Sequence, residues 1–531
     1  MDEQFDYVVI GAGSAGCVVA CRLVEAGLKV ALIEEGPTDK HMFVQMPGAF
    51  VRMIGTERTY LYKGEPQQEL GGRHPIVPQG RMLGGGSSIN AMIYVRGQPQ
   101  DYDDWAAGGA TGWGWNDVLP AFLRAEANEV LAGPLHGTTG PLRVSEPRHR
   151  HPLSSAFVRA AQQAGLPASR DFNGATQEGV GFYQTTTFDG QRGSTAATYL
   201  AQVLGRPNLR VLTGTRVRKL IIEGSRVTGV ETENLKDGAI GRILAGREVI
   251  LSAGALASPK ILMLSGIGDP AELALAGIPV AHALAGVGQN FQDHLEVSVY
   301  GRTRDPISLV GQDQGLRALI HGLQYKLFRS GLLTSTVVES GGFVDTTGAG
   351  RPDLQFHVLP VLAGDADRAP LPGHGISINP CFLRPQSRGR VRLRSGHFAD
   401  PILLEAGFLT ARADVETLIR GVKLARKILR QPALQALISE ELLPSAKPEI
   451  SDAEIEAHIR AFAKTVYHPT GTCKMGTDAL AVVDPSLRLH GMQGLRVCDA
   501  SVMPSLISGN TNAPTIMIAE RCAEFILKSP Q

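Results

Sequence analysis

The chain has 531 residues, 43% of them hydrophobic, and its 52 Lys and Arg residues offset 51 Asp and Glu residues to a formal net charge of +1. A chain of this length can bury a large core and is expected to form more than one domain. The even charge balance argues against a nucleic-acid-binding protein and against purely electrostatic adhesion to a membrane.

The cysteines and the hydrophobicity of the chain indicate where in the cell the protein is found. The six cysteines are scattered without a CxxC pair, which is typical of a reduced protein and not of a disulfide framework. No apolar run approaches the length of a membrane span, and the first predicted strand leaves no room before it for a signal peptide. We therefore expect a cytoplasmic protein without a transmembrane segment, and a location peripheral to a membrane stays open.

The start of the chain predicts a strand, a glycine-rich turn, a helix and a second strand. An apolar strand at 7–10 runs into Gly11, Gly13 and Gly16, and a second apolar strand follows the helix at 30–33. This order of elements is typical of a dinucleotide-binding βαβ unit.

The glycines and one acid indicate how a dinucleotide would bind. In such a unit the first glycine permits a tight turn, the second lets the backbone approach a pyrophosphate, and the third lets the helix lie close to the strand. The helix N-terminus directs unpaired N–H groups toward the phosphates. Glu34 can accept both ribose hydroxyls, which favours NAD or FAD over NADP. The residues expected to bind the dinucleotide here are Gly11, Gly13, Ser14, Ala15, Gly16 and Glu34.

Beyond this unit the chain does not continue as a simple alternation of strands and helices. The loop at 84–88 presents backbone N–H groups with almost no side-chain bulk, so it can pass close to a flat ring or a phosphate. Residues 206–254 alternate apolar and polar and predict strands. The later predicted elements are a turn at Ser258 and Pro259 with a short helix to Gly266, amphipathic helices near 413–431 and 451–466, and a last strand at 495–501.

The second of these amphipathic helices leads to His468. Ser451 and Glu454 form a capping box at its start. Four apolar residues give the helix one apolar face: Ile455, Ile459, Phe462 and Val466. Pro469 disfavours α geometry at His468, so the helix should end near Tyr467. An isolated histidine in such a turn is more often structural than catalytic.

Four separated segments resemble the glucose–methanol–choline (GMC) flavoprotein oxidoreductases, and together they extend over almost the whole chain. They are the βαβ unit, GRMLGGGSSINAMIYVRGQPQDYD at 80–103, GALASPKILMLSGIG at 254–268, and a C-terminal half-site with VYHPTGTCKMG and SGNTNAPTIMIAE. The resemblance implies an α/β fold (α+β overall), with a Rossmann-like FAD-binding domain and an inserted substrate domain built on an antiparallel sheet.

The resemblance also implies a discontinuous division of the chain. The FAD-binding domain would consist of residues 1–155, 196–304 and 466–531, and the substrate-binding domain of residues 156–195 and 305–465. The active site would lie between the two domains.

Further FAD contacts are implied by the same resemblance. The expected residues are Leu83, Gly86, Asn90, Ile93, Val217, Asp499 and Ala500. Some members of the family attach the flavin covalently through a His in the glycine loop, where this chain has Ile89. Because Ile89 cannot form that bond, non-covalent FAD is expected.

The resemblance assigns the chemistry to His468 and Asn512. His468 would accept the hydroxyl proton of a primary alcohol while hydride passes to flavin N5, which gives an aldehyde, and Asn512 would orient the substrate oxygen. Asn512 is also a good N-cap for the final predicted helix, whose first turn tolerates Pro514. We therefore expect an FAD-dependent alcohol dehydrogenase or oxidase acting on CH–OH donors.

Two alternatives stay open, an FAD-containing lyase of the hydroxynitrile-lyase type and a non-catalytic flavin-binding protein. The alcohol, the oligomeric state and the electron acceptor, oxygen or a quinone-type carrier, are not indicated by any motif. No residue cluster has metal-ligand spacing. His149 and His151 lie in a basic loop and are expected to be solvated, and His294 has no identifiable partner.

Overall fold

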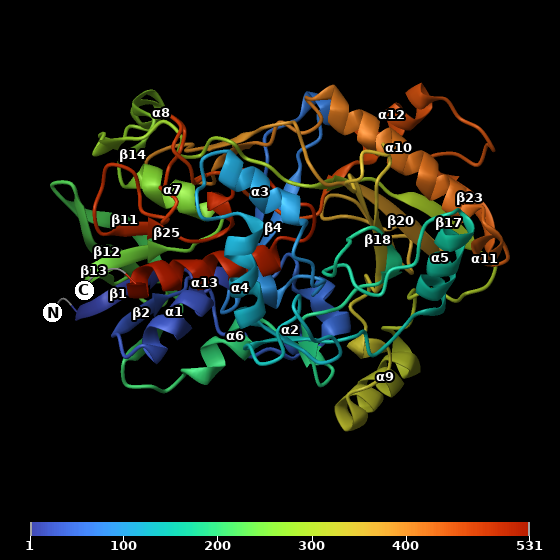
Figure 1. Cartoon of the computed structure of the whole chain (residues 1–531), viewed down its shortest axis with the longest axis horizontal. Helices are drawn as coiled ribbons and strands as arrows, with labels where there is room; N and C mark the ends of the chain where they lie inside the picture. Colours follow the sequence, from blue (N-terminus) through green and yellow to red (C-terminus); the bar gives the residue numbers. More distant parts are fainter. Residues whose placement is uncertain (1–2, 529–531) are drawn as a thin grey trace.

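The computed structural model describes residues 3–528 and contains two large β-sheets, one toward each end of the molecule (Figure 1). The first sheet has the strand order β10-β2-β1-β13-β12-β11, and β25 pairs with β13. Its strands are β1 (Glu3–Ile10), β2 (Val30–Ile33), β10 (Leu209–Leu212), β11 (Thr215–Glu223), β12 (Arg226–Asn234), β13 (Ile240–Leu251) and β25 (Leu495–Val497).

The strands β10, β2, β1, β13 and β25 run parallel to one another. β1 aligns Tyr7 with Val30 and Ile10 with Ile33 of β2. Continuous apolar sequences suit parallel strands that are covered on both faces, and every residue of β2 is buried. α1 (Ser14–Glu25) connects β1 to β2, so the three elements form the predicted βαβ unit.

The second sheet is antiparallel, with the strand order β23-β17-β20-β19-β18-β7, and β16 pairs with both β20 and β24. Its strands are β7 (Gly179–Phe182), β16 (Leu295–Glu296), β17 (Val299–Thr303), β18 (Ser340–Val344), β19 (Leu354–Leu359), β20 (Gly375–Phe382), β23 (Ile438–Leu443) and β24 (Lys464–Thr465). The helices α5 (Pro152–Gln163) and α10 (Arg412–Leu429) pack against this sheet. The predicted fold class is confirmed.

Segments of the chain contribute alternately to the first and the second sheet. Residues 295–303, which the predicted division assigns to the FAD-binding domain, supply β16 and β17 to the second sheet. The ends of that predicted domain, residues 1–2 and 529–531, lie outside the described residues.

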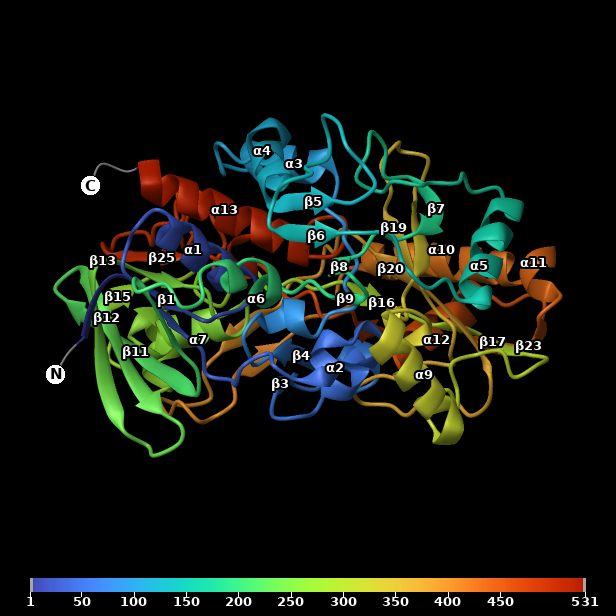
Figure 2. The ribbon, with the colours of Figure 1, turned by 90° about the horizontal axis from the view of Figure 1, so that it is seen from below.

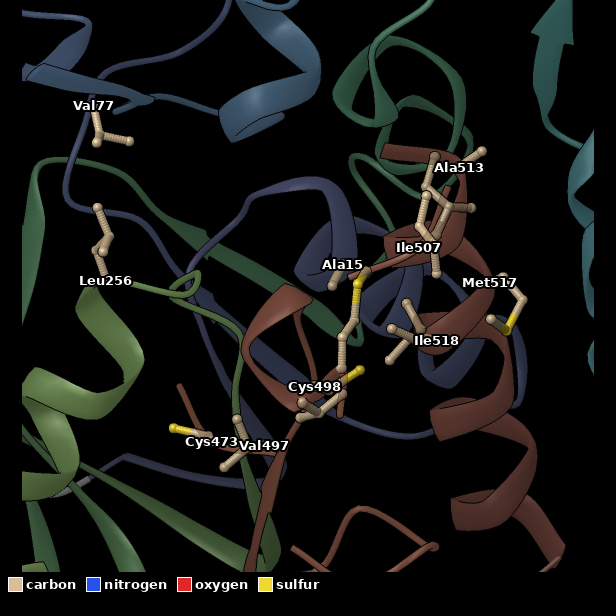
Figure 3. Close-up of a cluster of buried hydrophobic side chains, with 14 of the residues drawn as sticks. Ala15, Val77, Leu256, Cys473, Val497, Cys498, Ile507, Ala513, Met517 and Ile518 are labelled. Atoms are coloured by element: carbon tan, nitrogen blue, oxygen red, sulfur yellow. The ribbon is translucent and has the colours of Figure 1, made fainter. Parts of the chain in front are cut away.

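The final helix, α13 (Asn512–Lys528), packs beside α1. Figure 3 shows side chains of α1, α13 and the end of β25 gathered in one cluster, among them Ala15, Cys498 and Ile518. All three are almost completely buried. This packing places the first turn of α13 close to the first turn of α1.

A buried carboxylate ties α13 to its neighbours. Glu520 accepts hydrogen bonds from Arg22 Nη2 of α1 at 2.7 Å, from Tyr199 Oη at 2.8 Å and from Arg124 Nε of α4 (Trp115–Ala125) at 3.2 Å. Removing one partner of a buried ion pair commonly costs about 3–5 kcal/mol, because it leaves an uncompensated charge. Glu520 therefore fixes the direction in which α13 points.

The remaining elements are short or peripheral (Figures 1 and 2). In chain order they are α2 (Met42–Gln45), η1 (Pro47–Met53), β3 (Thr59–Lys63), η2 (Gln68–Leu70), β4 (Ile76–Gly80), η3 (Gly85–Ser88), α3 (Pro99–Ala107), β5 (Glu126–Asn128), β6 (Leu142–Val144), β8 (Thr187–Phe188), β9 (Gln191–Arg192), α6 (Thr195–Thr198), η4 (Leu200–Gln202), α7 (Ala257–Leu264), β14 (Ile267–Gly268), α8 (Pro270–Leu275), β15 (His282–Ala283), α9 (Gly315–Phe328), η5 (Leu332–Thr334), β21 (Arg390–Arg392), β22 (Leu403–Glu405), α11 (Pro432–Gln435), α12 (Asp452–Phe462) and η6 (Ala500–Val502).

The helix before His468 begins as predicted but ends earlier. Ser451 and Glu454 form the capping box of α12, which ends at Phe462 and not near Tyr467. The chain then enters β24, where Thr465 pairs with β16. The prediction for Val466 was wrong, because pairing with a strand far away in the sequence takes these residues out of the helix.

Two other boundaries differ from the predictions. The predicted turn at Ser258 and Pro259 lies inside the first turn of α7, a position that tolerates proline because its missing N–H has no helical partner. β25 ends at Val497, and Asp499 instead caps the short helix η6 by accepting from Ser501 N.

Several chemical features can be stated for residues 3–528. No helix there is both long and apolar enough to cross a membrane, and no group of three or more His, Cys, Asp or Glu side chains is arranged to hold a metal ion. All six cysteines are free and buried.

Candidate active site

The turn between β1 and α1 has the geometry that its glycines predict. Gly11 has φ of +90°, in the left-handed region that favours glycine. A Cβ atom at Gly16 would overlap the carbonyl oxygen of Gly11, so glycine here lets α1 approach β1. Gly13 precedes α1 and offers no side-chain cap, and it lines a cavity together with Ser14 and Ala15. The first N–H groups of α1 are thus available to an anion in this cavity.

The glycine loop packs directly against this turn. Gly84 has φ of +85°, and its N–H donates to the carbonyl of Ala12 at 2.7 Å. A Cβ atom at Gly85 would come within 2.7 Å of the Cα of Gly13. Ser87 Oγ closes the loop by donating to the Gly84 carbonyl at 2.6 Å. The two glycine-rich segments therefore form one continuous wall with almost no side chains.

Glu34 lies at the end of β2 with 8% of its surface exposed. Its Oε2 accepts from Ala12 N at 3.0 Å and its Oε1 accepts from Gly36 N at 2.8 Å. Burial raises the pKa of this carboxyl above its usual value, and the two backbone donors act in the opposite direction. The carboxyl is thereby held rigidly at the cavity wall, where a ribose hydroxyl could donate to it.

A cavity of about 1730 Å³ brings most of the predicted site together. The predicted residues that line it are Gly11, Gly13, Ser14, Ala15, Glu34, Gly86, Asn90, Ile93, Val217, His468, Asp499, Ala500 and Asn512. Gly16 lies behind the wall against Gly11, and Leu83 belongs to the hydrophobic core. The glycine turn between β1 and α1 and the predicted catalytic residues thus line the same cavity.

Among the described residues that line the cavity, four carry a buried side-chain atom without a hydrogen-bond partner. They are the hydroxyl of Ser252, whose residue lies beside Gly11, Nδ1 of His321, Nε2 of His357 and one terminal nitrogen of Arg368. Buried polar groups are nearly always paired in folded proteins, so unpaired ones that line a cavity fit a site that binds a polar ligand.

The backbone holds His468 firmly at the far end of the cavity. Its N–H donates to Asp293 Oδ1 at 2.8 Å, and Thr465 donates its hydroxyl to the same carboxyl group. Tyr467, just before it, has φ of +68° and donates its hydroxyl to Asp365 Oδ1 at 2.6 Å. Burial raises the pKa of Asp293 to about 7.

His294 determines which nitrogen of His468 carries the proton. His294 Nε2 lies 2.9 Å from the carbonyl of Leu383, and a carbonyl can only accept, so Nε2 carries the hydrogen. Burial lowers the pKa of His294 to about 3, so the ring is neutral and its Nδ1 is an acceptor. That Nδ1 lies 3.0 Å from Nδ1 of His468, which must therefore be the donor. Nε2 of His468 keeps its lone pair.

Burial also changes the acidity of His468. The pKa of His468 lies well below its usual value because the ring is buried and because His294 and His357 are close. The imidazole is thus neutral near pH 7 and can accept a proton from a group placed in the cavity. Nothing in the local sequence near His294 pointed to this contact, since the two residues are 174 positions apart.

Asn510 is the asparagine that contacts His468. Its Nδ2 lies 3.4 Å from Nε2 of His468. Asn512 is the first residue of α13 and not its N-cap, because Thr515 N donates to Thr511 O. The Asn512 side chain instead accepts from Ser14 Oγ at 2.8 Å. Sequence reasoning missed Asn510, although both asparagines stand in the segment SGNTNAPT.

Side chains of opposite charge lie close together in the cavity wall near His468. Glu296 Oε1 lies 3.5 Å from Lys464 Nζ, and Glu296 Oε2 lies 2.9 Å from Nδ1 of His357. Burial alone would lower the pKa of Lys464, yet the nearby Glu296 and Asp365 hold it above its usual value. Burial alone would raise the pKa of Glu296, but Lys464 and His357 keep it low. The two charges therefore neutralise each other.

The histidines expected to be solvated have partners. His149 Nδ1 lies 2.8 Å from Glu339 Oε1, and His151 is buried and caps α5 by accepting from Leu153 N. The prediction for these two residues was wrong, because Glu339, just before β18, approaches the basic loop and accepts hydrogen bonds from it.

Comparison with known proteins gives one consistent family. Models described as GMC oxidoreductase match residues 5–296 and 385–519. The chain is 42% identical over 532 residues to an alcohol dehydrogenase [acceptor] of Pseudomonas putida, covering 99% of this chain and 96% of that protein. It is 43% identical to the mitochondrial choline dehydrogenase of Homo sapiens, covering 99% and 90%. The crystal structure of pyridoxine 4-oxidase from Mesorbium loti superimposes with a TM-score of 0.90 at 32% identity, covering 99% and 100%.

Proposed function

Because the chain belongs to the GMC oxidoreductase family, we propose that it oxidises a primary alcohol to an aldehyde with non-covalently bound FAD and with His468 as the base. Relatives named alcohol dehydrogenase and choline dehydrogenase support action on CH–OH donors. The observation that carries the proposal is the single cavity shared by the glycine turn between β1 and α1 and by a neutral histidine whose Nε2 carries a lone pair.

The cavity wall fits FAD. Gly13 and Ser14 would hold the pyrophosphate, because their N–H groups lie at the start of α1, while Gly11, whose N–H donates to the Ile33 carbonyl, would shape the turn beside it. Glu34 and Val217 would hold the adenosine end. At the other end Gly86, Asn90 and Ile93 would face the ring, and Ile89 would leave it without a covalent bond. When bound, FAD supplies a hydride acceptor at flavin N5.

His468 would take the hydroxyl proton of the alcohol on Nε2. His294 would act as a positioning residue, because it fixes the tautomer of His468 without touching the substrate. A positioned base of this kind typically contributes about 10²–10⁴-fold in rate.

Asn510 would donate its Nδ2–H to the substrate oxygen. This moves the orienting role from Asn512 to Asn510, because the Asn510 amide lies beside Nε2 of His468 and the Asn512 amide is bonded to Ser14. The N-terminus of α13, where Asn512 lies, would stabilise negative charge that develops in the cavity.

The test is anaerobic absorbance of the purified holoprotein, titrated with a panel of primary alcohols. We expect one class of alcohol to bleach the flavin band. The variant His468→Ala should keep FAD and be reduced about 10²–10⁴-fold more slowly. The variant Asn510→Ala should also be slower, whereas His397→Ala, a change at an exposed histidine, should match the parent protein.

Each result has a defined meaning. Reduction of His468→Ala at the parental rate would refute the role of His468. Bound flavin that no alcohol bleaches would refute alcohol oxidation and favour the lyase or the non-catalytic flavin protein. Rapid reoxidation on admission of air would identify oxygen as an acceptor, and slow reoxidation would favour a quinone-type carrier.

A further inference from the structure

Helix α9 carries its apolar side chains on the outside. Five of them recur at helical spacing and form one stripe that is between 49% and 71% exposed: Leu316, Leu319, Ile320, Leu323 and Leu327. An amphipathic helix of a globular protein normally turns such a stripe toward the core. α9 does the reverse, and Figures 1 and 2 show it projecting from the lower right of the molecule.

The opposite face of α9 is anchored to the protein. Tyr325 is buried in a small cluster with Met46 and Ala49. Ala318 and His321, on the same side of the helix, line the cavity described above. The burial of Tyr325 thus determines which face of α9 points inward, and the apolar stripe lies on the other face.

Positive charges flank the stripe. Arg317 and Lys326 are exposed, and with 3.6 residues per turn they lie on opposite sides of the apolar residues. α9 contains no Asp or Glu, and Asp313 just before it is paired with Arg52 at 3.0 Å. An apolar face bordered by basic side chains is typical of helices that lie in the interface of a bilayer.

We propose that α9 docks the protein peripherally on the surface of an anionic lipid bilayer, with the apolar stripe among the acyl chains and with Arg317 and Lys326 at the headgroups. A second copy of the chain fits this face less well, because it would bring the same positive charges together. The charge that matters is local, since the whole chain has a net charge of only +1. This inference does not depend on the proposed alcohol oxidation.

Docking in this orientation would turn one opening of the cavity toward the lipid. Met42 and Val51, which are 63% and 52% exposed, line the cavity together with Gln314 just before α9. An apolar alcohol or a quinone-type acceptor dissolved in the bilayer would then reach the cavity without crossing water.

The test is co-sedimentation of the holoprotein with vesicles of phosphatidylcholine alone and of two parts phosphatidylcholine to one part phosphatidylglycerol. The parent protein should sediment with the anionic vesicles, and added salt should weaken this binding. Leu316→Ser/Leu327→Ser should bind at least about tenfold more weakly. The control Leu275→Ser/Ile240→Ser removes two apolar side chains that are 75% and 52% exposed outside α9 and should bind like the parent protein.

A second variant tests the charges. Arg317→Glu/Lys326→Glu should lose the preference for anionic vesicles, while its absorbance spectrum shows that FAD is still bound. Parental binding by the α9 leucine variant, or equal losses in it and in the control, would overturn the proposal. A concentration-dependent dimer that only the α9 leucine variant abolishes, without vesicle binding by the parent protein, would assign the face to a second copy and also overturn it.

Discussion

At His468, burial and a second imidazole give the ring properties that its sequence context does not predict. An unperturbed histidine has a pKa of about 6.5 and either tautomer. Here burial, His294 and His357 hold the pKa of His468 well below that value, and His294 selects the tautomer whose Nε2 carries no hydrogen. The ring is therefore ready to accept a proton over the whole neutral range.

This shift predicts the pH dependence of flavin reduction. A base works only when it is unprotonated, so the rate of flavin reduction falls as the pH drops through the pKa of the base. Because the pKa of His468 is lowered, this fall should come well below pH 6.5. Stopped-flow reduction by an alcohol, measured from acid to alkaline pH, checks this. An acid limb near pH 7 that disappears in Asp293→Asn would belong to Asp293, whose pKa burial raises to about 7. A fall in the rate near pH 7 that persists in Asp293→Asn would contradict the expectation for His468.

Lys464 predicts which alcohols the cavity admits. Its ammonium compensates Glu296, so the cavity offers no free carboxylate at this place to a cationic alcohol such as choline. Lys464→Met should raise kcat/KM for choline relative to a neutral alcohol of similar size by about tenfold or more, because a buried unpaired carboxylate attracts a cation. Lys464→Arg, which keeps the charge, should leave the ratio near the parental value. An unchanged ratio in Lys464→Met would show that Glu296 does not face the substrate.

Among the elements, the β1-α1-β2 unit depends on two glycines for different reasons. Gly16 is needed because a side chain there would meet the Gly11 carbonyl, whereas a Cβ at Gly13 would have only the Cα of Gly85 nearby, at 3.9 Å. Gly13 also has ordinary backbone angles, with φ of −77°. Packing within the protein thus explains Gly16 but not Gly13.

The two glycines should therefore respond differently to alanine. Gly16→Ala should lower the free energy of unfolding by about 1–3 kcal/mol, because the helix must move away from the strand. Gly13→Ala should fold normally and bind FAD weakly, because its methyl group would stand where a pyrophosphate approaches. Denaturant unfolding together with the flavin content of the purified proteins distinguishes the two effects. Normal flavin content in Gly13→Ala would contradict the assigned phosphate site.

The elements also show what the sequence could predict. The βαβ unit was predictable because its signals lie within thirty-odd neighbouring residues: apolar strands, glycine spacing and Glu34. β24 was not, since its two residues pair with β16, which is distant in the sequence, and the helix before His468 ends earlier than its apolar period indicates. The contact of His468 with His294 arises from the same distant pairing. Local patterns therefore predicted the cofactor end of the site better than the substrate end.

For the whole molecule, the cavity is where the two sheets meet. Val217 lies in the first sheet and Gly13 follows its strand β1, Glu296 and His357 lie in the second sheet, and His468 lies between β24 and β25. The complete set is therefore assembled only where the two sheets come together. A ligand that fills the cavity should consequently stabilise both sheets together.

This arrangement predicts how flavins affect thermal stability. A ligand that binds only the folded protein at a hundred times its dissociation constant adds about 2.7 kcal/mol of stability. FAD added back to cofactor-free protein should accordingly raise Tm by several degrees and give one cooperative transition. FMN lacks the adenosine half that Glu34 and Val217 would hold, so it should raise Tm much less. Differential scanning calorimetry with each flavin makes the comparison, and Glu34→Ala should reduce the effect of FAD toward that of FMN. An equal shift by FMN would mean that the end of the cavity at Glu34 does not contribute to cofactor binding.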